Sequence, residues 1–584
     1  MKNIAIFIAV FIAFFSVKIV SQVINVTPGY GTLNTAITTN GWNKTYVLQA
    51  GGWYGLNATV EIDSPITIIG TPAQPGQMPA IIQTGATPAG ATFGYMFAPV
   101  FADFTLKNVF IVNADLNNSV GSFVFGQSAK ARLVLDSVTT DPTGVAGLGS
   151  FGTDTVDYFM TNCLIMQEGN PLGLFDGFMW QYNGTTGADT MYVENNTFVD
   201  VGLNFYLGNT TWQRGAPATT QDNFLWFNHN SFIFGKSDLM NTYNEKSLFF
   251  TNNLLWQYGT VPFPRMSSIW FYNYGDMGPK NTVTCLIKAD TAFGETLPSQ
   301  RRNFTEYNYN YRDPRVNDIV KLGLDSGDVS YILPLVTPAS EKDSSREATI
   351  FSDKTNFPYF IAGNNIEDQP NTDPKFNDQK IYSLTDSAII WSKYAAENLW
   401  GFAPSSFPPS NEWPQYYYRA DTAEGNPTTW PRFDGSYANS QIQTASIEGL
   451  PLGDLNWFPA QKAIWQKNQA AIMAHILSEN TSIFTVTDVK KENNQAPISF
   501  ALSQNYPNPF NPSTVIKYSI PKSGMVTVKV YNLLGQEVAT LVNQMQNSGN
   551  YIVNFNANKL ASGVYMYRIQ SGNFTLTKKM ELLK

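Results

Sequence analysis

Acidic side chains recur where short apolar segments of the sequence end, and they are its clearest candidates for chemistry. They are Asp136, Asp141, Asp154, Asp157 and Glu194. Calcium is bound by several carboxylate and carbonyl oxygens, so carboxylates gathered on one face would form a calcium site. The simpler interpretation is that each lies in a solvated turn. We predict no bound cofactor, and calcium is the one candidate that the sequence leaves open.

Histidine and arginine offer little more. His229 lies in the polar segment NHNS and His475 in a segment with helical spacing. A lone histidine in either place is more often structural than catalytic. The segment Arg312-Asp313-Pro314-Arg315 could hold the carboxylate of a sugar acid, because guanidinium groups match carboxylates in a bidentate way, but a surface turn is the simpler interpretation. No residue is assigned a catalytic, cofactor-binding or metal-binding role.

The two cysteines, Cys163 and Cys285, each lie in an apolar, strand-like segment. An exported protein could pair them in a disulfide. We favour buried free thiols that act as small core side chains. Two cysteines and two distant histidines do not make a zinc site.

Aromatic residues are abundant, with 13 Trp and 29 Tyr. The clusters are Trp53-Tyr54, Trp180 with Tyr182, Trp270 with Phe271, Tyr272 and Tyr274, and Tyr416-Tyr417-Tyr418. Exposed rings offer flat apolar faces on which the C–H groups of sugars can stack. The alternative is that the rings fill the core or pad long loops.

Composition and charge limit the classes of partner that the protein can bind. Hydrophobic residues make up 43% of the chain and charged residues only 14%, which suits an extracellular β-rich protein with a large core. The formal net charge is −8; residues 499–584 carry +6, so the remainder carries −14. An acidic body without a basic stripe disfavours nucleic acid and anionic lipid as partners.

A loose repeat in the sequence predicts the strands and turns that carry these residues. Apolar segments followed by a polar turn give a column of turn residues: Asn108, Asp136, Asn162, Asn196, Asn230 and Asn253, with Asn308 as a further member. The first six are 28, 26, 34, 34 and 23 residues apart. Repeats of this length with short strands are typical of solenoid coils. Asparagine tolerates left-handed backbone angles, and its amide can donate and accept, so stacked copies would form a ladder.

Together with the opening YVLQAGG…VEIDSPITIIG, this layout resembles the pectin-lyase-like right-handed parallel β-helix, from about Val23 to Tyr311. A β-propeller or a set of sandwich domains is the rival architecture. Enzymes of the resembled fold cleave acidic polysaccharides with a calcium-binding carboxylate cluster and a basic residue, or with paired aspartates. Their signatures, a WIDH-like segment, RxPxxR, GHG or an adjacent Asp pair, are missing from this sequence.

Residues 314–486 form an irregular closing region rich in Pro, Asp, Ser and aromatics. Pro459 begins a helix predicted near 459–478, and this helix is a candidate cover for the open end of the solenoid. Residues 487–498 are polar and charged, and they are predicted to be a linker.

Residues 499–584 show strict apolar alternation, as in Val526, Val528 and Val530, punctuated by turn formers. This pattern predicts a small antiparallel, Ig-like β-sandwich. The motifs NYPNPFNPST, VYNLLGQEV and LASGVYMYRI and the end KKMELLK resemble the type A C-terminal sorting domain of type IX secretion substrates. The resemblance implies export through an outer-membrane translocon and removal by a sorting peptidase. The resemblance also implies that the remaining protein is then attached to surface lipopolysaccharide or released. A binding or spacing module is the alternative.

Residues 1–21 agree with export. Lys2, an apolar run from Ile4 to Val17 and Ser21 have the form of a secretory signal peptide. Lys18 makes the run too short to span a bilayer. We expect a mature chain that starts near Gln22 and has no transmembrane segment.

The sequence therefore predicts an all-β protein: a right-handed parallel β-helix over 22–313, followed by the sorting domain. We expect it outside the cell or anchored at the outer-membrane surface. Its body would act as a recognition or structural surface, with polysaccharide as the ligand class that the aromatics indicate. A polysaccharide lyase or glycoside hydrolase is the alternative.

Overall fold

The computed structural model of the chain describes twenty-seven stretches of it. These are residues 22–74, 76–85, 95–99, 102–112, 122–124, 131–140, 150–151, 156–168, 178–183, 188–201, 204–210, 223–235, 239–242, 245–258, 287–289, 298–311, 313–315, 354–355, 357–367, 373–379, 381–382, 433–482, 490–492, 499–522, 524–546, 549–572 and 574–583. Two compact units divide the chain. One unit comprises Ile19–Asn439 and Leu452–Trp457, and Ser440–Pro451 with Phe458–Lys584 belong to the other.

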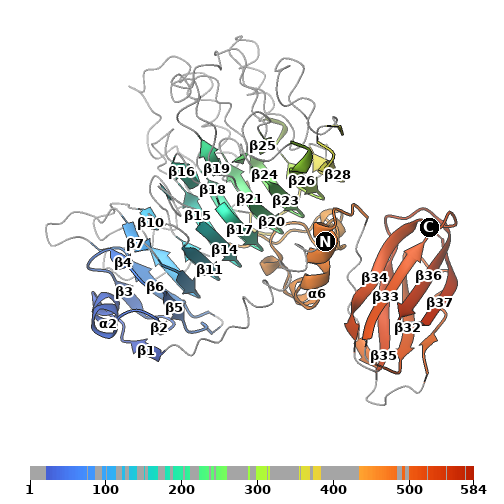
Figure 1. Cartoon of the computed structure of the whole chain (residues 1–584), viewed down its shortest axis with the longest axis horizontal. Coiled ribbons are helices and arrows are strands. Elements are labelled where there is room, and N and C mark those ends of the chain that lie inside the picture. The colour runs from blue at the N-terminus through green and yellow to red at the C-terminus, as the bar shows by residue number, and fades with distance from the viewer. Residues whose placement is uncertain are drawn as a thin grey trace, which may run out of the picture. The chain divides into compact units, whose positions relative to one another are not determined.

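The first unit is a parallel β-helix, as predicted, built on two long parallel sheets (Figure 1). The first sheet has eleven strands: β1 (Gln22–Val26), β2 (Lys44–Leu48), β5 (Ile66–Gly70), β8 (Phe104–Lys107), β11 (Arg132–Asp136), β14 (Val156–Thr161), β17 (Ala188–Glu194), β20 (Phe224–Asn228), β23 (Ser247–Thr251), β26 (Arg302–Glu306) and β28 (Phe360–Gly363). The second has ten: β3 (Trp53–Gly55), β6 (Ala80–Gln83), β9 (Val109–Val112), β12 (Thr139–Thr140), β15 (Leu164–Glu168), β18 (Thr197–Val201), β21 (Ser231–Gly235), β24 (Leu254–Tyr258), β27 (Tyr309–Tyr311) and β29 (Ile366–Glu367).

Shorter parallel sheets form a third side. One contains β4 (Val60–Ile62), β7 (Tyr95–Pro99) and β10 (Ser122–Val124); the other contains β13 (Ser150–Phe151), β16 (Phe178–Asn183), β19 (Asn204–Thr210), β22 (Met240–Thr242) and β25 (Ile287–Ala289). From the coil of β2 to the coil of β23, each coil thus places one strand on each side, and the strands of the two long sheets pair with those of successive coils in parallel register.

The core consists of columns with one inward side chain from each coil. In the first sheet, one column runs through Tyr46, Ile68, Leu106, Leu135, Met160, Val193, Phe227 and Phe250. Each of these side chains is at most 1% exposed. Strand alternation turns these positions inward, so the apolar-x-apolar segments of the sequence create the core.

Two features extend the helix beyond what the sequence predicts. The sheets continue past residue 313, because β28 pairs with β26 and β29 pairs with β27. At the other end, helix α2 (Thr32–Asn40) was not anticipated. Its buried Leu33 and Ile37 join the core cluster of the first coils. Figure 1 shows α2 beside β1 and β2, where it covers the N-terminal end of the core.

The second unit contains helix α6 (Pro459–Leu477) and an antiparallel β-sandwich. One sheet of the sandwich has the order β30 (Lys490–Glu492), β35 (Gly549–Asn556), β32 (Ser513–Ile520) and β31 (Ala501–Leu502). The other has the order β34 (Glu537–Gln546), β33 (Gly524–Tyr531), β36 (Gly563–Ser571) and β37 (Phe574–Leu582). β30 falls within the predicted linker and pairs with β35 as an edge strand.

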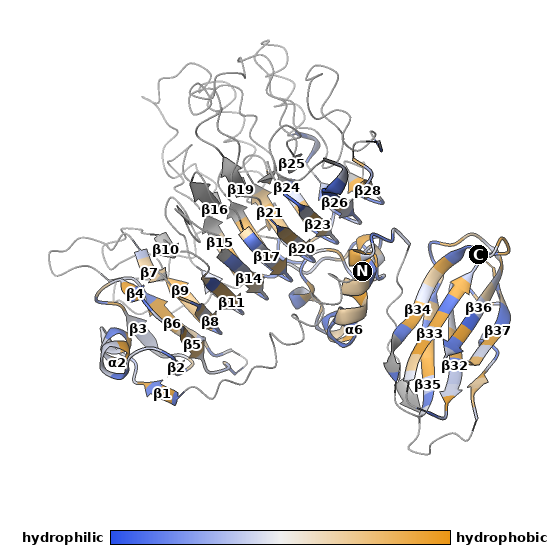
Figure 2. Cartoon of the chain, in the orientation of Figure 1, coloured by the Kyte–Doolittle hydropathy of each residue, from blue (hydrophilic) through white to orange (hydrophobic). Residues whose placement is uncertain are grey.

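Apolar alternation builds the sandwich as the sequence predicts. Ile516, Tyr518, Val526, Val528 and Val530 are buried between the sheets, whereas the residues between them face outward. Figure 2 shows this alternation as orange and blue bands along the strands.

Candidate functional site

From β8 onward, a short bend joins the first sheet to the second in each coil. Its first residue has left-handed backbone angles, and the members of this column are Asn108, Ser137, Asn162, Asn195, His229, Asn252, Tyr307 and Asn364. The residue that follows forms the inner column: Val109, Val138, Cys163, Asn196, Asn230, Asn253, Asn308 and Asn365. The predicted single column is therefore wrong in part. Asn196, Asn230, Asn253 and Asn308 belong to the inner column, but Asn108 and Asn162 lie one position earlier and Asp136 two.

From Asn196 onward the inner column is a hydrogen-bonded ladder. The Asn230 amide donates to Asn253 Oδ1 (3.1 Å) and to the carbonyl of Val193 (2.9 Å). Its Oδ1 accepts from the backbone N–H (3.2 Å) and the side-chain amide (3.0 Å) of Asn196. The same pattern runs through Asn253 and Asn308 to Asn365. Both donors and both lone pairs of a buried amide are used, so no polar group is left unpaired.

Cys163 ends the ladder on the N-terminal side. Its backbone N–H donates to Asn196 Oδ1 (2.9 Å), and the thiol donates to the carbonyl of Thr161 (3.2 Å). The side chain is 1% exposed and makes no disulfide, and burial raises the pKa of the thiol. The favoured interpretation of Cys163 as a buried free thiol is confirmed. Cys285 lies outside the described residues.

An outer set of hydrogen bonds occupies the carboxylates that were candidates for calcium. Asp136 Oδ1 accepts from Thr161 Oγ1 (3.0 Å) and Asn162 Nδ2 (2.8 Å). Glu194, 2% exposed, accepts from the Tyr192 hydroxyl, from Trp226 Nε1 (3.1 Å) and from Asn228 Nδ2 (2.8 Å). These side chains hold neighbouring coils together.

Asp157 lies near the start of β14, at the opposite end of that strand from the bend. Burial, then the nearby Asp189, raise the pKa of its carboxyl group, partly offset by Arg132. Among the described residues, no three His, Cys, Asp or Glu side chains lie close enough together to hold a metal. Asp141 and Asp154 fall outside the described residues.

A strap formed by Leu452–Trp457 packs across these bends, more than 200 residues away in sequence. Asp454 N–H donates to Ser231 Oγ (2.9 Å), and its carboxylate accepts from Thr197 Oγ1 (2.8 Å). Trp457 Nε1 donates to Thr197 Oγ1 (2.7 Å). Gly453 N–H donates to the carbonyl of Asn252 (2.8 Å). The buried Ser231 and Thr197 side chains of the coils therefore find hydrogen-bond partners in the strap.

Each of the two histidines has a ring nitrogen close to a backbone carbonyl. His229 is fully buried at a bend, where its Nδ1 donates to the carbonyl of Gly453 (3.1 Å). His475 lies on α6 with Nε2 2.8 Å from the carbonyl of Ser482, and burial lowers its pKa.

Arg315 pairs with Asp313, two residues earlier in the chain. Arg315 donates to Asp313 through Nε (2.9 Å) and Nη2 (2.6 Å). Burial alone would raise the pKa of Asp313, but these hydrogen bonds and the charge of Arg315 lower it. The guanidinium of Arg315 is thus already paired with a carboxylate, which favours the surface-turn interpretation. Arg312 is outside the described residues.

The predicted aromatic cluster at Trp53-Tyr54 divides between the core and the outside. Tyr54 is fully buried, and its hydroxyl donates to the carbonyl of Val26 (3.1 Å). Trp53 faces outward and packs against Ile81 and Phe110. Its Nε1 donates to Gln83 Oε1 (2.8 Å), and its ring stacks on Tyr30, with centroids 6.5 Å apart and an interplanar angle of 19°.

Tyr30 is the residue that sequence reasoning missed at this position. It is 53% exposed. Gly29 and Gly31 donate their backbone N–H groups to the carbonyls of Trp53 (2.8 Å) and Gly55 (2.7 Å), which places the segment alongside β3. The only sequence feature that could have pointed to Tyr30 is the run PGYG, which is not part of any aromatic cluster. We call Tyr30 and Trp53 the N-terminal aromatic pair.

The side chains of Trp180 and Tyr182, and all of Trp270, Phe271, Tyr272, Tyr274 and Tyr416–Tyr418, lie outside what the structure describes.

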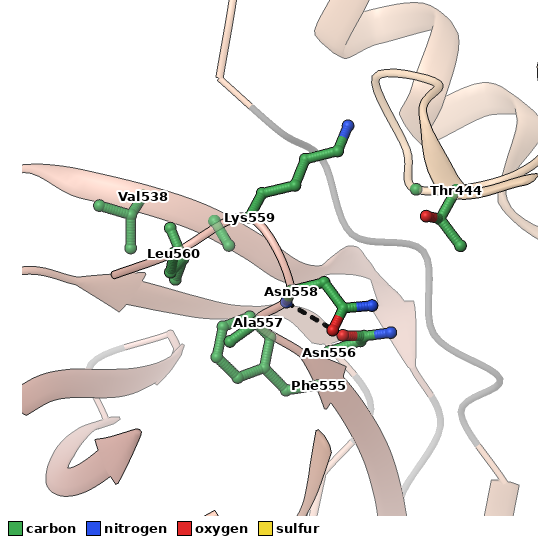
Figure 3. Close-up of a pocket in the computed structure, with 10 residues that line it drawn as sticks. Thr444, Val538, Phe555, Asn556, Ala557, Asn558, Lys559 and Leu560 are labelled. Atoms are coloured by element: carbon green, nitrogen blue, oxygen red, sulfur yellow. Dashed lines mark hydrogen bonds between the residues drawn. The ribbon is translucent and has the colours of Figure 1, made fainter. Parts of the chain in front are cut away.

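One small cavity of about 60 Å³ lies in the second unit, lined by Thr444, Gly449 and residues 538–539 and 555–560 (Figure 3). Asn558 N–H donates to Asn556 Oδ1 (3.1 Å) at its floor. Burial lowers the pKa of Lys559, partly offset by Glu448. The volume is well below the ~300 Å³ of small-molecule sites, so we assign it no ligand.

Comparison with known families identifies one part of the chain. Residues 504–582 match the family described as "Secretion system C-terminal sorting domain". The β-sandwich is thus similar to a secretion sorting domain. The match covers the sandwich and not the β-helix, and it supports export of the chain by the type IX secretion system to the cell surface or the extracellular space. No curated protein sequence matches the chain. None of the described helices has the length and apolarity to cross a membrane.

Proposed function

We propose that the protein is exported by the type IX machinery, that a sorting peptidase removes the sorting domain, and that the β-helix works outside the cell as a recognition surface. The observation that carries the proposal is the complete sorting sandwich at the C-terminus, matched over residues 504–582. Its own buried core, separate from that of the β-helix, supports a domain that acts as a transferable signal.

The test is the location of the chain in cells. Deleting residues 499–584 should trap the protein in the periplasm, whereas the full chain should be degraded by protease added to intact cells. A reporter fused ahead of residues 499–584 should gain surface exposure. Unchanged surface display of the deleted chain would refute the export proposal.

A body that recognises a ligand without changing it suits the bends described above, where the candidate carboxylates already bind neighbouring coils. Asp136 and Glu194 are the examples: each accepts two or more hydrogen bonds from the protein itself. Incubation with polygalacturonate should give no rise in the ultraviolet absorbance of unsaturated uronates, with or without calcium. A clear rise would favour the lyase alternative.

A further inference from the structure

We propose that the β-helix binds ordered water in its interior, in a polar layer formed by Asn303, Thr305 and Asn310. All three residues belong to the coil of β26 and β27. The inference goes beyond the proposed function and does not depend on it, because the site lies inside the coils and not on the outer surface.

The polar layer begins where the hydrophobic core of the coils ends. The residues that precede it in register, one coil earlier, are leucine and phenylalanine side chains of that core. Residues paired in parallel register point to the same side of a sheet, so the polar side chains face the same interior. Each of them is at most 1% exposed. The register pairs are Leu248 with Asn303, Phe250 with Thr305 and Leu255 with Asn310.

Protein groups do not satisfy this layer by themselves. Thr305 Oγ1 donates to Asn303 Oδ1 (2.8 Å). Asn303 Nδ2 and both polar atoms of the Asn310 amide are buried, and they form no hydrogen bond within the part of the chain that the structure describes. Buried polar groups in proteins are almost always paired with protein or with ordered water, because an unpaired group loses its hydration without compensation.

The ladder shows that the same coil can pair an amide fully. Asn308 donates to the carbonyl of Phe250 (2.9 Å) and to Asn365 Oδ1 (3.1 Å), and its own Oδ1 accepts from the side-chain amide of Asn253 (3.0 Å). Its position at the inner corner stacks it between other amides. Asn310 follows Leu255 in register instead, and a leucine side chain cannot hydrogen-bond an amide.

Side-chain size favours room for water in the layer. The column that contains Thr305 runs from Phe227 and Phe250 through Thr305 to Ala362. Two large rings are thus followed by two small side chains. A buried water needs about two to four polar partners as well as room. The three side chains of the layer supply them as amide donors, an amide oxygen and a hydroxyl oxygen.

A neutral ligand fits the layer better than an ion. The charges directly ahead of β26 already compensate each other, because Arg301 Nη2 lies 2.7 Å from Glu245 Oε2 and both side chains are buried. The layer itself contributes only amides and one hydroxyl, whereas a protein site for calcium uses several oxygen ligands with carboxylates among them. Water both donates and accepts, as an amide without protein partners requires.

A crystal structure of the full chain, at a resolution that shows ordered water, tests the proposal. We expect water within about 3.2 Å of Asn310 Oδ1 or Nδ2 and of a second polar group of the layer. Thr140 is the internal control. Its hydroxyl is also buried without a hydrogen-bond partner among the described residues, but its neighbours in register are Ile111 and Ile165. A water there would lack further polar partners, so we expect none.

The variant Asn310→Leu gives a second test in solution, because leucine continues the apolar column of Leu255. Oxygen-17 magnetic relaxation dispersion counts long-lived buried waters. The count should fall in Asn310→Leu and stay at the wild-type value in Thr140→Val, the matched change at the control position. Circular dichroism checks that both variants fold, and if Asn310→Leu does not fold, the wild-type crystal structure decides.

Several results would overturn the proposal. In the crystal these are the lack of water beside Asn310, direct hydrogen bonds from its amide to protein groups, or a peak with the short oxygen contacts of a cation. Water at Thr140 as well would show that a lone polar group is enough and that the layer has no special role. In solution, an equal count for Asn310→Leu and the wild type would contradict it.

Discussion

The coils before Cys163 and those after it use the same bend but fill its inner corner with different chemistry. Val109 and Val138 occupy the corner in the first group, and asparagines from Asn196 to Asn365 occupy it in the second. The left-handed residue ahead of the corner is kept in both groups, as at Asn108 and Asn252. The backbone therefore needs the left-handed residue, whereas the amide ladder is an addition.

The difference has a consequence for assembly. An apolar corner contributes by burial and close packing, whereas an amide corner also needs hydrogen-bond partners above and below in register. The strap contacts residues at the second kind of bend, through Asn195 and Asn252. The polar coils thus carry the long-range contacts that join distant parts of the chain.

The largest expected effect comes from removing one amide from the ladder. Asn230→Ala takes away the acceptor of the Asn196 backbone N–H, one of the two acceptors of the Asn196 side-chain amide and a donor to the Val193 carbonyl. Because these groups are buried, the change should cost about 3 kcal/mol or more. Val138→Ala, the matched change in an apolar corner, should cost about 1–2 kcal/mol. Urea unfolding followed by tryptophan fluorescence reports on this region, because residues 499–584 contain no tryptophan. Equal losses would break the comparison.

The strap should respond next. Gly453→Ala forces an L residue into φ +77° and brings its Cβ 2.4 Å from Ser231 Oγ and 2.9 Å from Leu254 Cβ. We expect a loss of about 2–3 kcal/mol and faster proteolysis of residues 452–457. Gly449→Ala has the same φ with open space around it, so it should cost only the backbone term of about 1 kcal/mol. If both variants behave alike, steric fit in the strap is not what matters.

A smaller effect depends on pH. Burial raises the pKa of Glu306, partly offset by a hydrogen bond from Asn364 Nδ2 (2.8 Å). A raised folded-state pKa stabilises the fold below the pKa of the unfolded chain, and this contribution is lost as pH rises through the folded value. Glu306→Gln should therefore match the wild type in acid and be more stable at neutral pH. Asp313→Asn should show the opposite sign, because its folded pKa is lowered. The urea midpoints of the wild type and of both variants, measured at several pH values, test these two signs.

The smallest change concerns Cys163, where the two kinds of corner meet. In a Cys285→Ser background, the thiol should not react with a disulfide reagent in the native protein and should react fully in urea, because it is buried and its pKa is raised. Rapid native reaction would show that this corner opens, and that the ladder does not protect its first member.

Local pattern predicted much of the fold. Alternation in Val526, Val528 and Val530 gave the sandwich, and apolar segments with recurring asparagines gave the solenoid. The alignment failed at Asn108 and Asn162, because asparagine suits both the left-handed position and the inner corner. It failed at Asp136 because that residue ends strand β11, just ahead of the bend. The exposed Tyr30 was missed because a single tyrosine between glycines resembles any loop.

Periodic patterns along neighbouring residues were sufficient to predict the sorting domain and the solenoid. Which side of each bend a polar residue faces depends on packing between coils. The tertiary structure also decided which acids are consumed between coils and where Leu452–Trp457 packs. Those outcomes depend on side chains that meet after 23 to more than 200 residues of intervening chain. No local pattern encodes such partners.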